Sequence, residues 1–393
     1  MGNRRKKIVR KSVILKMKKY KICKRCVMDN IIDPNIKFDK NGICGHCKRY
    51  KKIVKEKTFS GKDGWERLKK IGEKIKKDAK GREYDSIIGL SGGIDSTYTA
   101  YIAKKKLGLN PLAVHIDTGW NSEIAVGNIK RVLRKLDLSL YTIVINWKEM
   151  KDLQLSFFKA SVANCDIPQD HAILVGLYQA AIKFKIKYLL NGSNIRTEYI
   201  MPKNWGHDNR DGKHIIAIQR KFGKIKLRTF PIMTPLKEIY YLYLKRLKII
   251  KILNYIDYKK EGAKETLKRE LGWRDYGGKH YESRFTRFFQ TYYLPVKFNI
   301  DKRKAHFSNL IMSGEMTREE ALKELKKKPY DEKTIKFDKE YIARKLGVSL
   351  EEFERILALP PKKHTDYPTS NNSYALEKFI YYNARKILRL IKR

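Results

Sequence analysis

The chain has 393 residues, of which 88 are Lys or Arg and 42 are Asp or Glu, giving a formal net charge of +46, and 42% are hydrophobic. This length suggests two or three domains with buried cores, and apolar residues spread along the whole chain exclude low-complexity disorder. No apolar run approaches the roughly 18–20 residues of a membrane span, and the basic start lacks a signal-peptide pattern, so we expect a cytoplasmic protein.

Residues 1–83 precede the first strand that the sequence predicts. Residues 1–20 form a basic lead-in, and residues 21–50 hold four of the five cysteines. Residues 51–83 are predicted to be a charged helical connector, because Leu68 and Ile75 recur with other apolar residues at helical spacing.

Residues 84–235 alternate strands with helices. Strands are predicted at 85–90, 111–116, 141–145 and 188–190, and helices at 98–107, 122–136 and 170–186. This alternation indicates βαβ units, and therefore an α/β fold with a doubly wound parallel sheet and helices on both faces.

Residues 236–393 lose the strand pattern and are predicted to form a mostly helical C-terminal region. Helices are predicted at 236–271, 280–293, 317–328 and 374–392. Thr317 with Glu320, and Ser349 with Glu352, have the spacing of a capping box that opens a helix.

Four cysteines form two close pairs. Two residues separate Cys23 from Cys26 and Cys44 from Cys47, and seventeen residues lie between the pairs. Two such knuckles place four thiolates around one ion, which is typical of a structural zinc site without an open catalytic position. We therefore predict an N-terminal zinc ribbon, in which His46 is not a ligand.

A second motif, SGGIDST, follows the first predicted strand directly and opens a helix. Its glycines let the backbone approach a phosphate group, and the helix start directs N–H groups and a positive dipole end toward that phosphate. Its hydroxyls add donors, and its carboxylate suits the magnesium ion that accompanies a nucleotide. The candidate ATP-binding residues are Ser91, Gly92, Gly93, Asp95, Ser96 and Thr97. The motif resembles the pyrophosphate loop (PP-loop) of the N-type ATP pyrophosphatases, which split ATP between its α and β phosphates.

Polar turns follow two other predicted strands, with Asp117 after the second and Gly192 after the fourth. Because ligands bind at the carboxyl ends of parallel strands, we expect both turns to flank the nucleotide. We interpret the lone Cys165 as a small core residue rather than a sulfur carrier. Asp170 with His171 supplies either a base or a favourable charge at a helix start.

The four-cysteine ribbon directly ahead of the loop makes the resemblance more specific. From about residue 20 to beyond 330, the chain resembles the N-acetyl sugar amidotransferases of bacterial surface-polysaccharide and nonulosonic-acid biosynthesis. The stretches that carry this resemblance are 21–29, the loop, 168–171, 191–194 and 276–283.

The resemblance implies ATP-dependent conversion of a sugar's acetamido group to acetamidino, with release of AMP and pyrophosphate. Asp95 and Ser96 would act in catalysis, with Asp95 on Mg²⁺. The residues expected to contact the N-acetylated sugar are Arg196, Glu198, His280, Arg284 and Arg287. A solvated charged face is an equal reading of the last three.

The resemblance also implies partners. No glutaminase signature is visible in the chain, so ammonia is expected from a separate glutamine amidotransferase subunit through a cyclase-like channelling subunit. One alternative is a tRNA-modifying enzyme with the same loop, and another is a zinc-ribbon nucleic-acid binder. Both would use the basic charge, although an AT-rich coding sequence produces the same lysine bias without any nucleic-acid partner.

Overall fold

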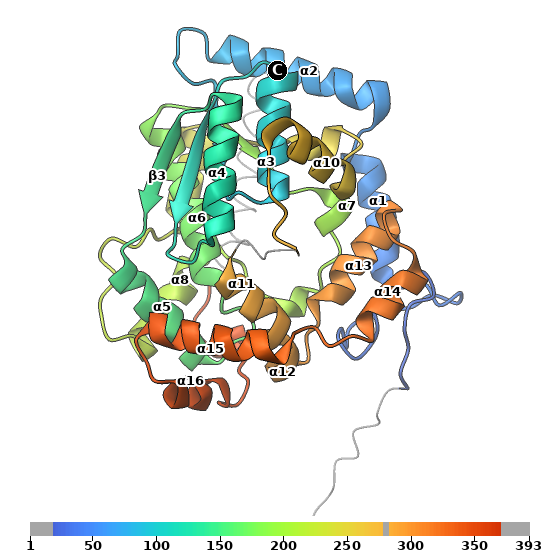
Figure 1. The fold of residues 1–393 in the computed structure, drawn as a ribbon, viewed down its shortest axis with the longest axis vertical. Helices are drawn as coiled ribbons and strands as arrows, with labels where there is room; N and C mark the ends of the chain where they lie inside the picture. Colours follow the sequence, from blue (N-terminus) through green and yellow to red (C-terminus); the bar gives the residue numbers. More distant parts are fainter. Residues whose placement is uncertain (1–18, 278–282, 371–393) are drawn as a thin grey trace, which may run out of the picture.

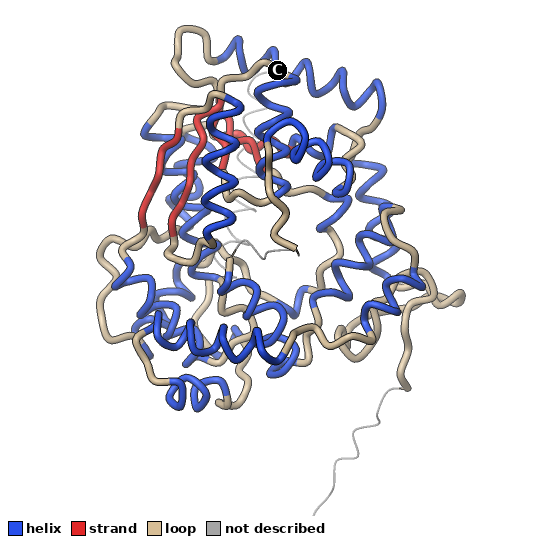
Figure 2. The backbone as a smooth tube through the Cα atoms, in the orientation of Figure 1, coloured by secondary structure: helices blue, strands red, loops and turns tan. Residues whose placement is uncertain are grey.

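Five parallel strands form one sheet in the order β3-β2-β1-β4-β5 (Figures 1 and 2), in a computed structural model that describes residues 19–277 and 283–370. The strands are β1 (Ser86–Gly89), β2 (Pro111–Asp117), β3 (Leu140–Val144), β4 (Tyr188–Asn191) and β5 (Lys248–Lys251). Ile87 of β1 is in register with Leu112 of β2 and Leu189 of β4. The predicted parallel α/β sheet is confirmed.

Helices cover both faces of the sheet, because alternate side chains of the central strands point to opposite sides. Ile87 belongs to a core that includes α5 (Trp147–Ala160) and α6 (Ile167–Lys183). Ile88 belongs to a second core. That core is built with α2 (Gly61–Asp78), α3 (Ile94–Tyr101), α4 (Glu123–Leu136) and α10 (Lys260–Leu271).

The C-terminal region is helical, as predicted, and its last helices pack on α5 below the carboxyl ends of the strands (Figure 1). Phe158 of α5 packs against Phe285, Tyr293 and Phe353 of this region. The Thr317 capping box with Glu320 is present. The helices are α11 (Arg284–Phe288), α12 (Leu294–Phe298), α13 (Lys302–Ser313), α14 (Arg318–Leu325), α15 (Glu332–Leu346) and α16 (Leu350–Leu357).

The N-terminal ribbon lies beside α13 and α14, and its second cysteine pair stands at the start of α1 (Gly45–Lys57). Three short helices complete the described part. They are α7 (Ile195–Glu198), α8 (Gly212–Phe222) and α9 (Pro235–Ile239). No helix within the described ranges is both long and apolar enough to cross a membrane.

Three expectations about elements are corrected. Residues 51–83 form parts of two helices, because the backbone is extended at Thr58 and Ser60. Residues 236–271 are not one helix, since β5 adds an edge strand to β4, and its mostly exposed Lys-Ile-Ile-Lys sequence lacks a buried-strand pattern. Helix α5 occupies a stretch for which no element was predicted. The basic lead-in up to residue 18 and the helix predicted at 374–392 lie outside the described residues.

Candidate functional site

The four cysteines of the ribbon form a buried cluster whose sulfur atoms all lie within 4.8 Å of one another. The Cys23–Cys47 and Cys26–Cys44 sulfur distances are 3.9 and 3.7 Å. A tetrahedral ion with sulfur ligands at about 2.3 Å requires sulfur–sulfur edges of about 3.8 Å. The cluster therefore has the dimensions of a metal site. His46 points instead to Asp33, whose Oδ2 lies 2.7 Å from Nε2, in agreement with its predicted exclusion from the ligands.

The PP-loop turns sharply between β1 and α3. Gly92 has φ +78°, and a Cβ added there would lie 2.4 Å from the carbonyl oxygen of Ala125, so only glycine fits. The loop is also tied to itself by hydroxyls. The Ser91 hydroxyl accepts from the N–H of Gly93 at 3.2 Å, and the Ser96 hydroxyl donates to the Gly93 carbonyl at 3.1 Å.

Aromatic residues from the region after β5 hold the loop from outside. Trp273 Nε1 donates to the Gly92 carbonyl at 2.9 Å, and the N–H of Ile94 donates to the Tyr276 hydroxyl at 3.2 Å. The buried Tyr258 hydroxyl donates to Asp95 Oδ1. Burial, together with the Asp95 carboxylate, raises the pKa of Tyr258, so the phenol stays protonated as a donor.

Two cavities adjoin the loop. The larger of these two has a volume of about 620 Å³ and opens on the loop. Five loop residues line it, and Gly192, directly after β4, joins them. A Cβ on Gly192 would lie 2.8 Å from the backbone carbonyl of Asp95, so the two turns are in close contact. The loop residues are Ser91, Gly93, Ile94, Asp95 and Ser96, and the polar lining residues from other elements include Glu198, Lys260, Lys264, His306 and Glu315.

The lining of the larger cavity combines carboxylates from separate elements. Asp95 lies at the start of α3, Glu198 ends α7, and Glu315 follows α13. Carboxylate oxygens are the ligands that Mg²⁺ prefers beside phosphate groups. Glu315 Oε2 also accepts from the N–H of Lys260 at 2.7 Å, which ties the C-terminal region to the start of α10. The cavity therefore suits a magnesium-bound polyphosphate next to the loop.

A smaller cavity of about 430 Å³ lies over the carboxyl ends of β1, β2 and β4 and shares Ser91 and Gly192 with the larger one. Its lining includes apolar residues of these strands and Asp166 from the start of α6. Burial and the neighbouring Asp170 carboxylate raise the pKa of Asp166 to about 7, although the Thr286 hydroxyl donates to it at 3.2 Å. This cavity has the size and position expected for a nucleoside.

Several predicted ATP-binding residues do not line either cavity. Thr97 is fully buried. The Asp117 carboxylate closes its own turn by accepting from the N–H of Gly119 at 2.8 Å and from Asn121 Nδ2 at 3.0 Å. Its neighbours His115 and Thr118 line the smaller cavity instead. Gly92 contributes through the shape of the loop, as described above.

The predicted sugar-contacting residues separate in space. Glu198 lines the larger cavity with the loop. Arg196 is not in the lining of either cavity, and its carbonyl accepts from the Tyr50 hydroxyl of α1 at 2.8 Å. Arg287 donates to the carboxylate of the buried Asp338 through both Nε and Nη2, and the Nε–Oδ2 distance is 3.0 Å.

Two more of the residues expected to contact the sugar are Arg284 and His280. The Arg284 guanidinium stacks over Phe337 and Tyr341, at 5.3 and 4.9 Å from the ring centres. His280 lies outside the described residues. The expectation that Arg284 and Arg287 contact the sugar stays a prediction, and in this structure each side chain is engaged with α15.

His171 and Cys165 have structural surroundings. His171 Nε2 accepts from the N–H of Met233 at 2.9 Å, and its Nδ1 lies 2.6 Å from the Asn209 carbonyl. Burial lowers the pKa of His171 to about 4, so the imidazole is neutral. Cys165 is fully buried, and burial raises its pKa, in agreement with its interpretation as a core residue.

Comparisons with known proteins divide the chain in the same way as the fold. Residues 66–200 match the NAD synthase family. Residues 282–381 match the family described as the C-terminal domain of LPS biosynthesis protein WbpG-like proteins. The first match contains the PP-loop, β1, β2 and β4, and the second contains the helices from α11 onward.

The individual proteins similar to this chain share low sequence identity with it or match only a short part of it. One subunit of the glutamine-hydrolyzing GMP synthase of Methanococcus vannielii is 36% identical over 107 residues, which is 26% of this chain and 30% of that protein. An uncharacterized protein of Methanocaldococcus jannaschii is 24% identical over 171 residues, 40% of this chain and 59% of that protein. NMN synthetase from Francisella tularensis aligns with a TM-score of 0.32 and 14% identity, over 73% of this chain and 96% of that one.

The chain spans at most 59% of the length of the curated relatives named above. The two family matches nevertheless follow the observed order of PP-loop domain and helical region, and neither match covers the ribbon. The chain therefore joins an NAD-synthase-type PP-loop domain to a WbpG-like C-terminal domain, a combination consistent with the N-acetyl sugar amidotransferases that its sequence resembles.

Proposed function

We propose that this protein is an ATP-dependent amidotransferase that converts an acetamido group of an N-acetylated sugar to acetamidino. The observation that carries the proposal is the larger cavity, which the PP-loop shares with residues of the WbpG-like region. The NAD-synthase-type domain and the WbpG-like domain both line this cavity. Such a site suits a reaction in which ATP, bound by the first domain, activates a sugar acceptor that the second domain helps to bind.

The bond changes of the proposed reaction balance in two steps. In the first step, the acetamido oxygen attacks the α-phosphorus, the bond from that phosphorus to the β-phosphate oxygen breaks, and pyrophosphate leaves. The amide nitrogen loses its proton, giving an imidoyl adenylate. In the second step, ammonia attacks the imidoyl carbon, the carbon–oxygen bond breaks, and AMP leaves with the original acetamido oxygen. The product is a protonated amidine, which keeps all three protons of ammonia, one of them on the original amide nitrogen.

The loop and the two cavities have separate roles in this scheme. Ser91, Gly93 and Ser96 would hold the β and γ phosphates, and Asp95 with Glu198 would hold Mg²⁺ beside them. The smaller cavity would take the adenosine. Positioning and charge stabilisation supply most of the rate in phosphate transfer, so rigid support of the loop is central to the proposal.

The metal of the ribbon is proposed to be a structural Zn²⁺. Four thiolates with tetrahedral spacing leave no open position, which fits a site that folds the ribbon and does not catalyse. We further propose that ammonia comes from a separate glutaminase subunit through a cyclase-like channelling subunit. The glutamine-hydrolyzing GMP synthases among the relatives support glutamine as the nitrogen source.

A mass-spectrometric product assay tests the proposed reaction. Purified protein receives ATP, Mg²⁺, ammonium and a panel of diacetamido sugars, with bulk tRNA as a parallel substrate. The proposal predicts a sugar lighter by the difference between O and NH, with AMP released in equal amount, and no product from Asp95→Ala or Ser96→Ala. Mass gain on tRNA instead of a sugar product would favour the tRNA-modifying alternative.

A further inference from the structure

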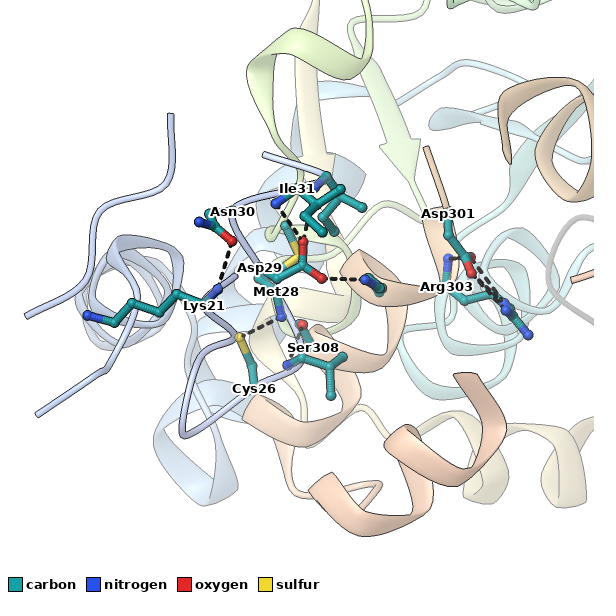
Figure 3. Close-up of polar contacts among 12 residues, drawn as sticks. Lys21, Cys26, Met28, Asp29, Asn30, Ile31, Asp301, Arg303 and Ser308 are labelled. Atoms are coloured by element: carbon teal, nitrogen blue, oxygen red, sulfur yellow. Dashed lines mark hydrogen bonds and ion pairs between the residues drawn. The ribbon is translucent and has the colours of Figure 1, made fainter. Parts of the chain in front are cut away.

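Helix α13 lies against the ribbon on one side (Figure 3). Lys304 forms an ion pair with the fully buried Asp29, which follows the first cysteine knuckle. The Ser308 hydroxyl accepts from the N–H of Val27 at 3.3 Å. Lys304 and Ser308 are four residues apart, so they share one face of the helix.

The next helix strengthens the same contact. Arg318, at the start of α14, donates through Nη2 to the Cys23 carbonyl at 3.1 Å and through Nε to the Cys26 carbonyl at 3.3 Å. These carbonyls belong to the knuckle whose geometry depends on the metal. The backbone of the first cysteine pair is therefore bound directly to the α13–α14 hairpin.

A different face of α13 borders the two cavities. Lys302 lines the smaller cavity, and His306 and Leu310 line the larger one. These residues are four apart along one stripe of the helix. Asn309, between the two faces, accepts from the N–H of Ile200 at 2.8 Å and so fixes the segment after α7.

The PP-loop depends on other elements. The Gly92 carbonyl accepts from Trp273 and Asn128, and the Ile94 N–H donates to Tyr276. The Asp95 carboxylate accepts from Tyr258. These four residues come from α4 and from the segments around α10, not from the ribbon or α13. The site therefore has two walls with different main supports, and the hydrogen bond from the Lys260 N–H to Glu315 Oε2 joins them at one edge.

We propose that the metal-loaded ribbon positions α13 and thereby sets the wall of the site that faces the PP-loop. In this arrangement Lys304 and Ser308 are positioning residues, and His306 and Leu310, which line the larger cavity, present the surface that the acceptor meets. Assigning that wall to the acceptor rests on the proposed function, whereas the mechanical link from ribbon to helix does not.

Lys304→Met tests the link in the full-length, metal-loaded protein, and Lys327→Met is the matched control. The control also removes a lysine from an ion pair, but its side chain is 64% exposed and its partner, Glu324, belongs to α14 and not to the ribbon. Asp29 keeps its backbone donors at Ile31 and Ile32, at 2.9 and 3.0 Å, so the variant is expected to fold. The readouts are bound metal, hydrogen exchange by mass spectrometry, and affinity for a non-hydrolysable ATP analogue.

We expect exchange over residues 302–313 to become at least fivefold faster in Lys304→Met, with unchanged exchange over 86–101, unchanged bound metal, and ATP-analogue affinity within twofold of wild type. Ser308→Ala should show a smaller change of the same kind, and metal removal by a chelator a larger one. Exchange over 302–313 equal to that of Lys327→Met would overturn the link. Equal acceleration over 86–101 would overturn the claim that the two walls have different main supports.

Sugar kinetics then separate this inference from the proposed function. With any sugar that reacts, Lys304→Met should raise KM for the sugar at least fivefold and leave KM for ATP unchanged. If both KM values rise together, the assignment of α13 to the acceptor is wrong. If no sugar reacts with wild type while the exchange pattern holds, the proposed function fails and the link from ribbon to α13 stands.

Discussion

Substitution of Gly192 by alanine should slow catalysis while the protein remains folded. A Cβ at this position would lie 2.8 Å from the carbonyl carbon and oxygen of Asp95 and 3.0 Å from the N–H of Ser96. Few Cβ contacts are closer than 3.4 Å, so the two turns must separate by roughly half an ångström. The atoms concerned are backbone atoms, which cannot move aside by rotamer changes.

The size of the effect follows from this displacement. A misplacement of about 1 Å in a phosphate-transfer site lowers the rate on the order of 100-fold, so half that shift should lower AMP release roughly 10-fold to 100-fold. Overpacking of this kind lowers the free energy of unfolding by about 1–3 kcal/mol, so the variant should remain folded. Gly192 has no positive φ, so backbone strain adds nothing to the effect.

The assay compares Gly192→Ala with Gly262→Ala. A Cβ at the helical Gly262 meets nothing within 4 Å, and alanine there should stabilise the protein by about 0.5–1 kcal/mol without affecting the site. ATP-analogue affinity, steady-state AMP release and the melting temperature are measured for both variants. AMP release by Gly192→Ala within twofold of wild type would refute the inferred contact between the β4 turn and the PP-loop.

Three further predictions address other parts of the structure. Tyr258→Phe removes the hydroxyl that donates to Asp95 and should raise the Mg²⁺ concentration for half-maximal AMP release roughly threefold to thirtyfold; an unchanged Mg²⁺ requirement would contradict this role. Burial lowers the pKa of His171 and of His214 to about 4, so between pH 6.5 and 4 the unfolded chain binds more protons, and stability should fall as pH falls. The raised pKa of Asp166 acts in the opposite direction and offsets part of this loss. Denaturant unfolding should therefore show a net loss of about 1–2 kcal/mol from pH 7 to pH 5, and an equal free energy of unfolding at both values would refute it. Cys26→Ser should abolish stoichiometric metal binding, measured by elemental mass spectrometry, and full occupancy would exclude Cys26 as a ligand.

Local patterns predicted the ribbon and the PP-loop correctly. Both depend on residues close together in sequence, where spacing alone sets geometry: two residues within each cysteine pair, and a glycine pair between a strand and a helix. The strands β1, β2 and β4 were predicted for a similar reason, since central parallel strands are short, continuous apolar runs.

Long-range support of the site had no comparable signal. Tyr258 and Trp273 are more than 160 residues from the loop atoms that they bind, and each is one aromatic residue among many in a lysine-rich stretch. The edge strand β5 was missed because its residues alternate poorly and are mostly exposed. The expected sugar contacts at Arg284 and Arg287 came from the family resemblance, which does not reveal that Asp338 and the rings of α15 engage these side chains.

The role of α13 also escapes the sequence. His306 lies in no recognisable motif. Its helix connects the ribbon to the cavities because the fold brings together Val27 and Ser308, which are 281 positions apart in the sequence. Such couplings follow from packing between distant segments, and a single sequence carries no periodic or compositional trace of them.

Transfer of labelled oxygen tests the central claim most directly. A reactive N-acetylated sugar is prepared with ¹⁸O in its acetamido carbonyl and incubated with the protein, ATP, Mg²⁺ and ammonium, and AMP is analysed by mass spectrometry. Attack of the acetamido oxygen on the α-phosphorus predicts one ¹⁸O in each AMP formed with product. Amidine formation with unlabelled AMP would contradict an adenylated acceptor, and with it the role assigned to the PP-loop.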